Sequence, residues 1–439
     1  MKIYPRTRKI FLTFLALLTL FTQSLFIASP VLAARNKAAV CHINGNGVYH
    51  LINVAPSAVP AHLAHGDSLP GDDYPGLVGY IFDDDCRPEL VYRLPAAADD
   101  ALTATVNIIN NYGAGTLFAN NGSGADDLGL PVATLVSFGD GSFGGSVTDN
   151  SAGATIAVPV IGGTLTVNAD GSLAISNPTT PGIFTFEYRI ENAAGFSDAT
   201  VTVTIQAPPI AQDDSYTFLY SANVSASAGI GLFTDNGSGA DYLGFPSGTL
   251  VSFGGGSLGG AVTDNAAGAS AAFAGGTLTV NADGSWSLTG QPFTPGTYTF
   301  DYRIQNAVGA SDATVTFIIQ DPPTAQPDAL TATVTVINNY GASTLFADSG
   351  TGADHLGTPT ATLIAFGGGS LGGSVTDNPA GSTIAVPVLG GTLTVNADGS
   401  LVISNPTVPG IFTFEYRIEN TSGSSDATVT VTIDAGDGT

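Results

Sequence analysis

Residues 184–192 read Phe-Thr-Phe-Glu-Tyr-Arg-Ile-Glu-Asn, and apolar and polar side chains alternate along them. Because neighbouring side chains of a β-strand point to opposite faces, this period of two predicts a strand with one buried and one exposed face. Residues 199–205 alternate in the same way, with apolar residues separated by threonines. The two segments therefore predict half-buried strands that need a second apolar surface to cover them.

Further strand-like runs precede this pair. They occupy residues 101–109, 132–138, 155–161, 163–168 and 172–177. Asn-Ala-Asp-Gly at 168–171 lies between the last two runs and predicts a hairpin turn, because glycine readily adopts the positive φ that such turns need. About seven short strands within roughly 110 residues are typical of a sandwich of two sheets.

The same phrases occur three times along the chain. Gly-Gly-Thr-Leu-Thr-Val-Asn-Ala-Asp-Gly-Ser begins at residues 162, 275 and 390, and Ser-Asp-Ala-Thr-Val-Thr ends each copy. This period is too long for a solenoid repeat of 20–50 residues, so each copy is expected to be a whole domain. Pro-Pro pairs at the joints predict stiff spacers. We place the sandwich domains at 97–206, 207–320 and 321–439.

Composition agrees with an all-β chain of several domains. Of 439 residues, 56 are glycine and 25 are proline, while only 11% are charged. This profile argues against a helical bundle, a coiled coil or a doubly wound nucleotide-binding fold. Acidic residues outnumber basic ones 36 to 11, giving a net charge of −25. Nucleic acid is not an expected partner, because neutralising phosphates requires Lys and Arg.

Residues 1–33 have the pattern of a signal peptide. Four basic residues within residues 1–9 precede an apolar run that begins at Ile10, and Val-Leu-Ala ends at Ala33. We predict cleavage after Ala33 by a Sec-type pathway, which would make the chain secreted or exposed at the cell surface with no remaining membrane span. An uncleaved membrane anchor is the alternative, because the run is almost long enough to span a bilayer.

The repeated phrases resemble those of a known group of domains. Ala-Gln-Asp-Asp-Ser-Tyr begins at residue 211, and Leu-Phe-Thr-Asp-Asn-Gly-Ser-Gly-Ala-Asp-Tyr-Leu-Gly begins at 232. Together with Val-Asn-Ala-Asp-Gly-Ser and Phe-x-Tyr-Arg-Ile, they are similar to bacterial cadherin-like and Ig-like tandem repeats of secreted and surface proteins. The resemblance implies tandem Ig-like or cadherin-like β-sandwich domains in an extended adhesive or structural array, often stiffened by calcium.

Aspartates recur at two places where calcium could bind. Calcium takes six to eight oxygen ligands, mostly from carboxylates and carbonyls. The joint aspartates are Asp99, Asp100, Asp213, Asp214 and Asp328. The loop aspartates are Asp126, Asp241 and Asp354, with Asn120, Asp235 and Asp348 six residues earlier. In the alternative interpretation, these residues favour turns and keep an acidic surface soluble.

Residues 34–96 differ from the rest and hold both cysteines and four of the five histidines. They resemble a short Cys/His module that begins other bacterial secreted proteins. A disulfide between Cys41 and Cys86 would stabilise so small a core by roughly 3–4 kcal/mol. A second hypothesis is a transition-metal site on a helix capped by Ser57 and ended by Gly66. Its candidate ligands are His62 and His65, with one of His42, His50 or Asp67. A third hypothesis is a Cys–His catalytic pair.

Three other residue types recur or stand out. The single arginine of each domain is expected in a surface ion pair, and a ligand-binding arginine is the alternative. Trp286 is expected to pack among strand neighbours rather than to offer a carbohydrate platform. The aspartates of the Asn-Ala-Asp-Gly phrase are expected to form turns. The arginines are Arg189, Arg303 and Arg417, and the aspartates are Asp170, Asp283 and Asp398.

These observations predict a structural or adhesive extracellular protein that is not an enzyme. The sandwich domains lack cysteine, and only the third has a histidine, His355, so the first two cannot hold a Ser–His–Asp triad. The alternative function is a binding module, either for polysaccharide or, through the Cys/His module, for a metal or a protein. The partner would be an extracellular protein or polysaccharide. A fragment of a longer surface protein is a further possibility.

Overall fold

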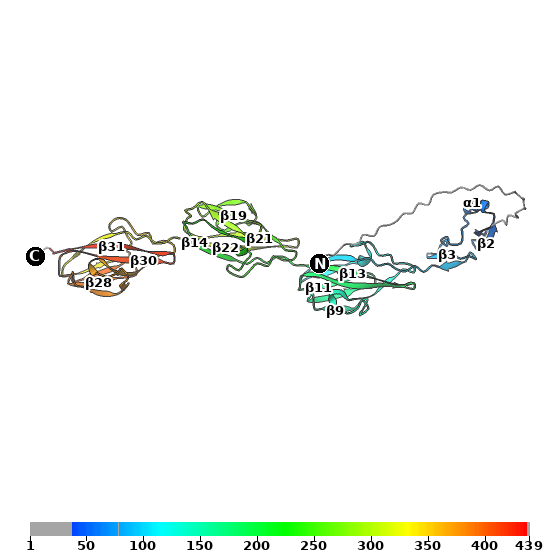
Figure 1. The fold of residues 1–439 in the computed structure, drawn as a ribbon, viewed down its shortest axis with the longest axis horizontal. Coiled ribbons are helices and arrows are strands. Elements are labelled where there is room, and N and C mark those ends of the chain that lie inside the picture. The colour runs from blue at the N-terminus through cyan, green and yellow to red at the C-terminus, as the bar shows by residue number, and fades with distance from the viewer. Residues whose placement is uncertain (1–36, 78, 437–439) are drawn as a thin grey trace, which may run out of the picture. The chain divides into compact units, whose positions relative to one another are not determined.

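The computed structural model describes residues 37–77 and 79–436 (Figure 1). The predicted signal peptide lies outside the described residues. Contacts between residues divide the chain into two units, Met1–Arg93 and Leu94–Thr439. None of the helices in the described part of the chain has the length and apolar character needed to cross a membrane.

The larger unit contains three Ig-like β-sandwiches, the first coloured cyan to green in Figure 1. In the first, a five-stranded sheet has the order β5-β13-β12-β7-β8, and a four-stranded sheet has the order β6-β11-β10-β9. Its elements are β5 (Asp100–Thr105), β6 (Ile109–Tyr112), η2 (Thr116–Phe118), β7 (Thr134–Gly139), η3 (Gly141–Phe143), β8 (Asn150–Ser151), β9 (Thr155–Val158), β10 (Gly163–Val167), β11 (Leu173–Ser176), β12 (Gly182–Asn192) and β13 (Gly195–Gln206).

The second and third sandwiches repeat this topology. Their five-stranded sheets are β14-β22-β21-β16-β17 and β23-β31-β30-β25-β26, and their four-stranded sheets are β15-β20-β19-β18 and β24-β29-β28-β27. The second comprises β14 (Asp214–Leu219), β15 (Val224–Ala226), η4 (Ala228–Ile230), β16 (Thr249–Gly254), η5 (Gly256–Leu258), β17 (Asn265–Ala266), β18 (Ser270–Phe273), β19 (Gly276–Val280), β20 (Trp286–Thr289), β21 (Gly296–Gln305) and β22 (Ala310–Gln320). The third comprises β23 (Asp328–Thr333), β24 (Ile337–Tyr340), β25 (Thr362–Gly367), η6 (Gly369–Leu371), β26 (Asn378–Pro379), β27 (Thr383–Val386), β28 (Gly391–Val395), β29 (Leu401–Ser404), β30 (Gly410–Asn420) and β31 (Gly423–Asp434).

The two most regular sequence segments form the long antiparallel hairpin β12–β13. Phe186, Tyr188 and Ile190 are fully buried, as their shared face predicts. On the opposite edge of β13, β5 pairs in parallel, from Asp100 beside Val201 to Thr105 beside Gln206. The first strand of the domain is thus held directly against its last strand.

One predicted strand proves to be two. The run 101–109 divides into β5 and β6, which belong to different sheets. Asn107 between them has a φ of 61°, so the chain turns there. The turn is held by Asn110, whose Nδ2 donates to Thr105 O at 2.9 Å while its Oδ1 accepts the Thr105 N–H at 2.8 Å. Apolar alternation continues across this turn and conceals it.

Each sandwich buries its own apolar core between its two sheets. In the first, Phe186 and Val201 of one sheet pack in the same cluster as Leu165 and Ile175 of the other. Separate clusters fill the second and third sandwiches. The all-β expectation is therefore confirmed, with cores of aliphatic and aromatic side chains and no disulfide among the described residues of the sandwiches.

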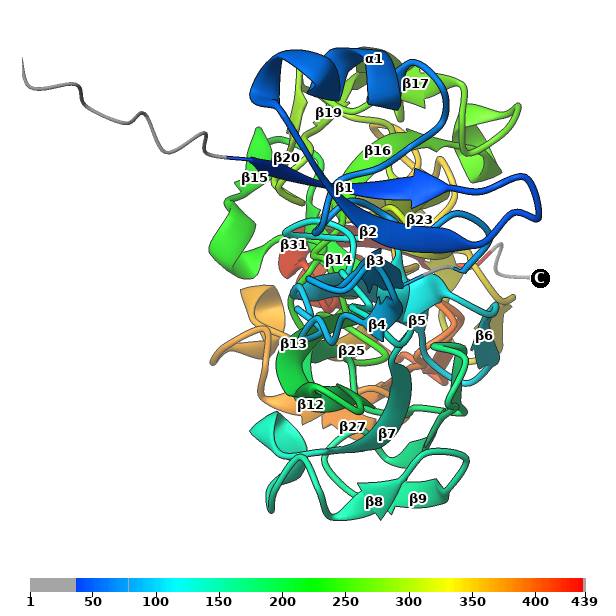
Figure 2. The same ribbon diagram turned by 90° about the vertical axis from the view of Figure 1, so that its right-hand side faces the viewer.

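The described residues of the smaller unit form two small hairpins and one short α-helix, coloured blue in Figure 2. Its elements are β1 (Ala38–Ile43), β2 (Tyr49–Val54), η1 (Pro56–Ala58), α1 (Val59–Leu63), β3 (Tyr80–Phe82) and β4 (Pro88–Leu90). The expected Ser57 cap is wrong. Ser57 lies within the 3-10 turn that Pro56 begins, and Ala58, at the N-cap of α1, offers no side-chain acceptor. The helix also ends at Leu63, before Gly66.

Candidate functional site

Each sandwich brings one joint aspartate and one loop aspartate together beside a buried tyrosine. The tyrosine hydroxyl lies 2.8–2.9 Å from a loop carboxylate oxygen in every domain. Burial and the charge of the loop carboxylate raise the pKa of the joint aspartate, and the tyrosine hydroxyl lowers it. We call these groups the carboxylate–tyrosine clusters. They are Asp100, Asp126 and Tyr188; Asp214, Asp241 and Tyr302; and Asp328, Asp354 and Tyr416.

Close approach of two backbones builds the first cluster. Asp100, the first residue of β5, forms a β-bridge with Gly122 of the glycine-rich loop. A Cβ atom at Gly122 would lie 2.4 Å from Asp99 O, so only glycine fits there. Ser123 N–H also donates to Asp99 O at 2.9 Å. The loop is thereby held against β5, and this places Asp126 near Asp100.

The cluster contains more hydrogen-bond acceptors than protons. Tyr188 Oη lies within 3.2 Å of Ala98 O, Leu117 O and both carboxylate oxygens of Asp126, yet a phenol has one proton to donate. Asp100 is only 3% exposed, and neither of its oxygens has a hydrogen bond of ordinary geometry among the described residues. The same is true of Asp214 and Asp328. A proton or a cation would satisfy such a site.

Electrostatics in the clusters favour the protonated joint carboxyl. Burial, assisted by the charge of Asp126, raises the pKa of Asp100 to about 7. Burial and the charge of Asp241 raise the pKa of Asp214 to about 8. In the third domain, burial and the loop carboxylate raise the pKa of Asp328 to about 7. Two carboxyl groups in each cluster therefore resist being ionised together unless a positive charge joins them.

The other aspartates predicted to bind calcium lie outside the clusters. Asp99 accepts the Thr200 N–H at 2.9 Å, and Asp213 accepts the Thr314 N–H at 2.8 Å. Both side chains connect the joint to the last strand instead of turning inward. Asp235 and Asp348 are exposed. Of the ten aspartates proposed as ligands, the structure brings six together in pairs.

The tyrosines of the clusters were missed as site residues. Sequence alternation places Tyr188 on the buried face of its strand, but it treats that face as apolar. The available signal was the recurrence of tyrosine, and never phenylalanine, at the third position of Phe-x-Tyr-Arg-Ile. A buried tyrosine usually needs a polar partner for its hydroxyl.

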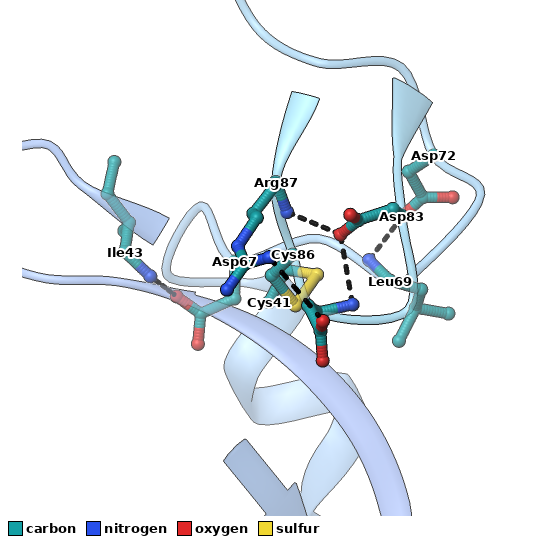
Figure 3. Close-up of a disulfide and its surroundings, with 9 residues drawn as sticks. Cys41, Ile43, Asp67, Leu69, Asp72, Asp83, Cys86 and Arg87 are labelled. Atoms are coloured by element: carbon teal, nitrogen blue, oxygen red, sulfur yellow. Dashed lines mark hydrogen bonds and ion pairs between the residues drawn. A yellow bond between two sulfur atoms is a disulfide. The ribbon is translucent and has the colours of Figure 1, made fainter. Parts of the chain in front are cut away.

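The predicted disulfide is confirmed in the smaller unit. Cys41 and Cys86 are joined at an S–S distance of 2.07 Å (Figure 3). Beside the bridge, Asp83 Oδ1 accepts the backbone N–H groups of Asp85 and Arg87 and fixes the turn before β4. Because both cysteines are oxidised, neither can act as a thiolate nucleophile. The hypothesis of a Cys–His catalytic pair is therefore wrong.

Two histidines of this unit meet one buried aspartate. Cys41 of β1 forms a β-bridge with Ser68, which places the neighbouring Asp67 beside His42. His42 Nδ1 lies 2.8 Å and His62 Nδ1 2.7 Å from the same oxygen, Asp67 Oδ2. The other oxygen, Oδ1, accepts the Ile43 N–H at 2.9 Å. We call these three side chains, of His42, His62 and Asp67, the histidine–aspartate cluster.

The cluster differs from the expected helical pair of histidines. His65 follows α1 and is not part of the group of donor atoms, because the helix ends too early to continue its face. His50 lies opposite His42 in the β1–β2 pair, with ring centroids 5.3 Å apart. Although burial favours neutral Asp67, hydrogen bonds from His42, Ile43 and His62 lower its pKa to about 2. Asp67 is thus a carboxylate at neutral pH.

The arginines, the tryptophan and the turn aspartates lie as expected from the sequence. Arg189 forms a bidentate ion pair with Asp198, directly across β12 and β13, at 2.7 Å for both contacts. Trp286 is 4% exposed and packs against Phe317, so it is not an exposed sugar platform. Asp170 accepts the Ser172 N–H within its turn. The equivalent ion pairs are Arg303–Asp312 and Arg417–Asp426, and the equivalent turn residues are Asp283 and Asp398.

No protein-family model matches the chain, and no curated protein matches it. Among solved structures, it is similar to the I-band fragment I67–I69 from titin, with a TM-score of 0.36 and 11% identity, covering 79% of this chain and 100% of that one. It is also similar to Sidekick-1 immunoglobulin domains 1–5, with a TM-score of 0.30 and 13% identity over 78% of this chain and 59% of that one. Extracellular domains 3–5 of Drosophila OTK give a TM-score of 0.29 and 10% identity, covering 78% and 97%.

Proposed function

We propose that this chain is a secreted or cell-surface protein with a structural or adhesive role, that it is not an enzyme, and that calcium stabilises its domains. Its partner would be an extracellular protein or polysaccharide. The observation that carries the proposal is the recurrence of one carboxylate–tyrosine cluster at the same place in three sandwiches. The signal-peptide pattern of residues 1–33, in which basic residues are followed by an apolar run and then by small residues, supports export. Hydrolysis by the purified chain that is lost on Glu187→Gln would contradict a non-enzymatic role.

The donors of the cluster suit calcium. The first cluster offers four carboxylate oxygens from Asp100 and Asp126, with the Tyr188 hydroxyl and the Ala98 and Leu117 carbonyls beside them. Calcium accepts six to eight such oxygens in flexible geometry, whereas magnesium requires a near-ideal octahedron. A divalent cation would also hold both carboxyl groups ionised, which burial alone opposes.

Calcium bound there would connect two parts of each domain. Asp100 begins β5, and Asp126 lies in the glycine-rich loop, so one ion would fasten the loop to the strand that begins the sandwich. The bound ion would also offset part of the net charge of −25. We therefore expect calcium to raise domain stability and to stiffen the chain near each joint.

Thermal melting of the full chain tests this proposal. At neutral pH, free calcium at 100 times its Kd should stabilise a binding domain by about 2.7 kcal/mol relative to chelator. The triple variant Asp100→Asn, Asp214→Asn and Asp328→Asn should lose this shift, because an amide cannot supply the charge. Asp348→Asn is the matched control, since Asp348 is exposed in the loop region of the third domain. No shift up to millimolar calcium, or the same shift in the triple variant, would contradict calcium binding at the clusters.

A further inference from the structure

We propose that His42, His62 and Asp67 bind a divalent first-row transition metal ion of the Zn²⁺ class. The geometry points to this site because three donor atoms from three separate segments converge. One donor atom from each of His42, His62 and Asp67 lies within 4.8 Å of the other two. The inference is independent of calcium at the carboxylate–tyrosine clusters, which lie in the other unit of the chain.

The spacing of the donors is close to what a tetrahedral ion needs. The two nitrogen–oxygen distances are 2.8 and 2.7 Å. Ligands about 2.0–2.1 Å from a tetrahedral zinc ion lie roughly 3.3 Å from one another. The side chains would have to separate by about half an ångström, which small rotations of the imidazoles can supply. The ion would then replace two hydrogen bonds that already point at one oxygen.

The surrounding structure holds these ligands in place before any ion arrives. The Asp67 side chain is 0% exposed, and Ile43 N–H fixes its second oxygen. His42 lies on β1 next to the disulfide-bonded Cys41, and His62 lies in α1. Such second contacts orient metal ligands and raise their affinity. The His42 and His62 side chains are 40% and 26% exposed, so one side stays open for entry and for a water ligand.

Proton balance is simple for this mode of binding. Each Nδ1 faces a carboxylate oxygen, so each neutral imidazole carries its proton on Nδ1 and donates it to Asp67. To bind the ion through Nδ1, each ring must move that proton through solvent to Nε2. The ion would then face two neutral imidazoles and one carboxylate. This exchange of tautomers is a signature that a purely structural hydrogen-bonded cluster would not show.

The donor types select the class of ion. Imidazole nitrogens suit zinc, copper, nickel and iron, whereas calcium and magnesium prefer oxygen ligands. Two nitrogens and one oxygen therefore separate this cluster from the oxygen-only clusters of the sandwiches. The chain should hold two chemically distinct kinds of cation site, which can be titrated independently.

Zinc titration of the full, oxidised chain tests the inference. We expect one zinc ion per chain in the presence of excess calcium, and visible absorption bands when Co²⁺ is used instead. Each of His42→Gln and His62→Gln should weaken zinc binding at least about 10–100-fold. Glutamine can still donate to Asp67, so these variants should keep the unit folded. His65→Gln is the matched control, because His65 is nearby in sequence but outside the cluster, and it should bind zinc as the original chain does.

Nitrogen NMR of the histidine side chains gives a readout that stability alone would not move. With only five histidines in the chain, the signals of His42 and His62 can be assigned by substitution. Zinc should convert both rings from the Nδ1–H to the Nε2–H tautomer while the disulfide stays intact. The inference is overturned if zinc does not bind, if His65→Gln weakens binding as much as His62→Gln, or if both rings keep the Nδ1–H tautomer.

Discussion

At the scale of single residues, the decisive feature is a carboxyl group buried beside another carboxyl group. Asp100, Asp214 and Asp328 are each 3% exposed, and no arginine or lysine is among the causes that shift their pKa. Protonation or a bound cation are the two ways to relieve such a pair. Raising the pH without a cation should therefore destabilise the sandwiches, whereas binding a cation should stabilise them.

Without divalent cations, we expect the sandwiches to lose stability as pH rises from about 4 to about 8. The pKa of Asp100 is raised from 3.8 to about 7 by burial, so the folded state binds more protons than the unfolded state across this range. The stabilisation from the protonated carboxyl is complete below the pKa of the unfolded state. It is lost as the pH rises through the pKa of the folded state, at up to about 1.4 kcal/mol per pH unit for each such group.

Chemical denaturation at several pH values, with chelator present, measures this slope. Asp100→Asn, combined with Asp214→Asn and Asp328→Asn, should flatten it, because an amide does not titrate. Asp348→Asn should leave the slope unchanged, which controls for general loss of negative charge. Stability that rises through the same range in the original chain would show that the joint aspartates are already ionised and satisfied in the fold.

At the scale of elements, the smaller unit depends on its disulfide. Its buried apolar cluster consists of Cys41, Phe82 and Cys86, with Tyr49 and Tyr74 packed against them. Two of these three buried residues are the bridge itself. So small a core would not by itself compensate the entropy lost in ordering two short hairpins. The bridge also holds β1 near β4, since Cys86 lies two residues before Pro88.

Reduction should therefore unfold the smaller unit alone. Opening a loop with a sequence separation of 45 residues costs roughly 3–4 kcal/mol of stability on the chain-entropy model. Hydrogen exchange should show residues 38–54 losing protection in reductant, while residues 182–206 of the first sandwich keep theirs. Alkylation of both thiols confirms that reduction is complete. If residues 38–54 stay protected after full alkylation, the packing of Phe82 and its neighbours suffices without the bridge.

Local patterns of the sequence predict the elements well but not the contacts between them. Alternation identifies β12 and β13 because every second side chain is apolar. It misses the turn at Asn107, because the apolar residues around it continue the pattern of the strand, and an asparagine, although it tolerates positive φ, is only a weak sign of a turn. Asp100 and Asp126 are both recognisable as candidate ligands, yet their pairing depends on Gly122 approaching β5. Likewise, His42 meets Asp67 only through the bridge between Cys41 and Ser68.

At the scale of the whole molecule, three sandwiches with separate cores should respond separately to ligands. The single tryptophan, Trp286, is buried in the core of the second sandwich, against Tyr216 and Phe317. Its fluorescence therefore reports the unfolding of that domain alone. Circular dichroism reports all three.

Fluorescence-detected melting should thus respond only to the second carboxylate–tyrosine cluster. We expect calcium to raise the fluorescence midpoint by roughly 4 °C for each kcal/mol by which the bound ion stabilises this domain. Asp214→Asn should abolish that rise, whereas Asp100→Asn and Asp328→Asn should leave it in place, because distant independent sites act additively. A fluorescence midpoint that falls equally in all three variants would mean that the domains unfold as one cooperative body.

The parallel pairing of β5 with β13 has a mechanical consequence. Chain tension would enter a domain at the start of β5 and leave it at the end of β13, and these points lie at opposite ends of the paired ladder from Asp100–Val201 to Thr105–Gln206. Such a load shears the two strands along their length, so the hydrogen bonds between them must break together and not one after another. A cation fastened at Asp100 would sit at the very residue where that pull begins.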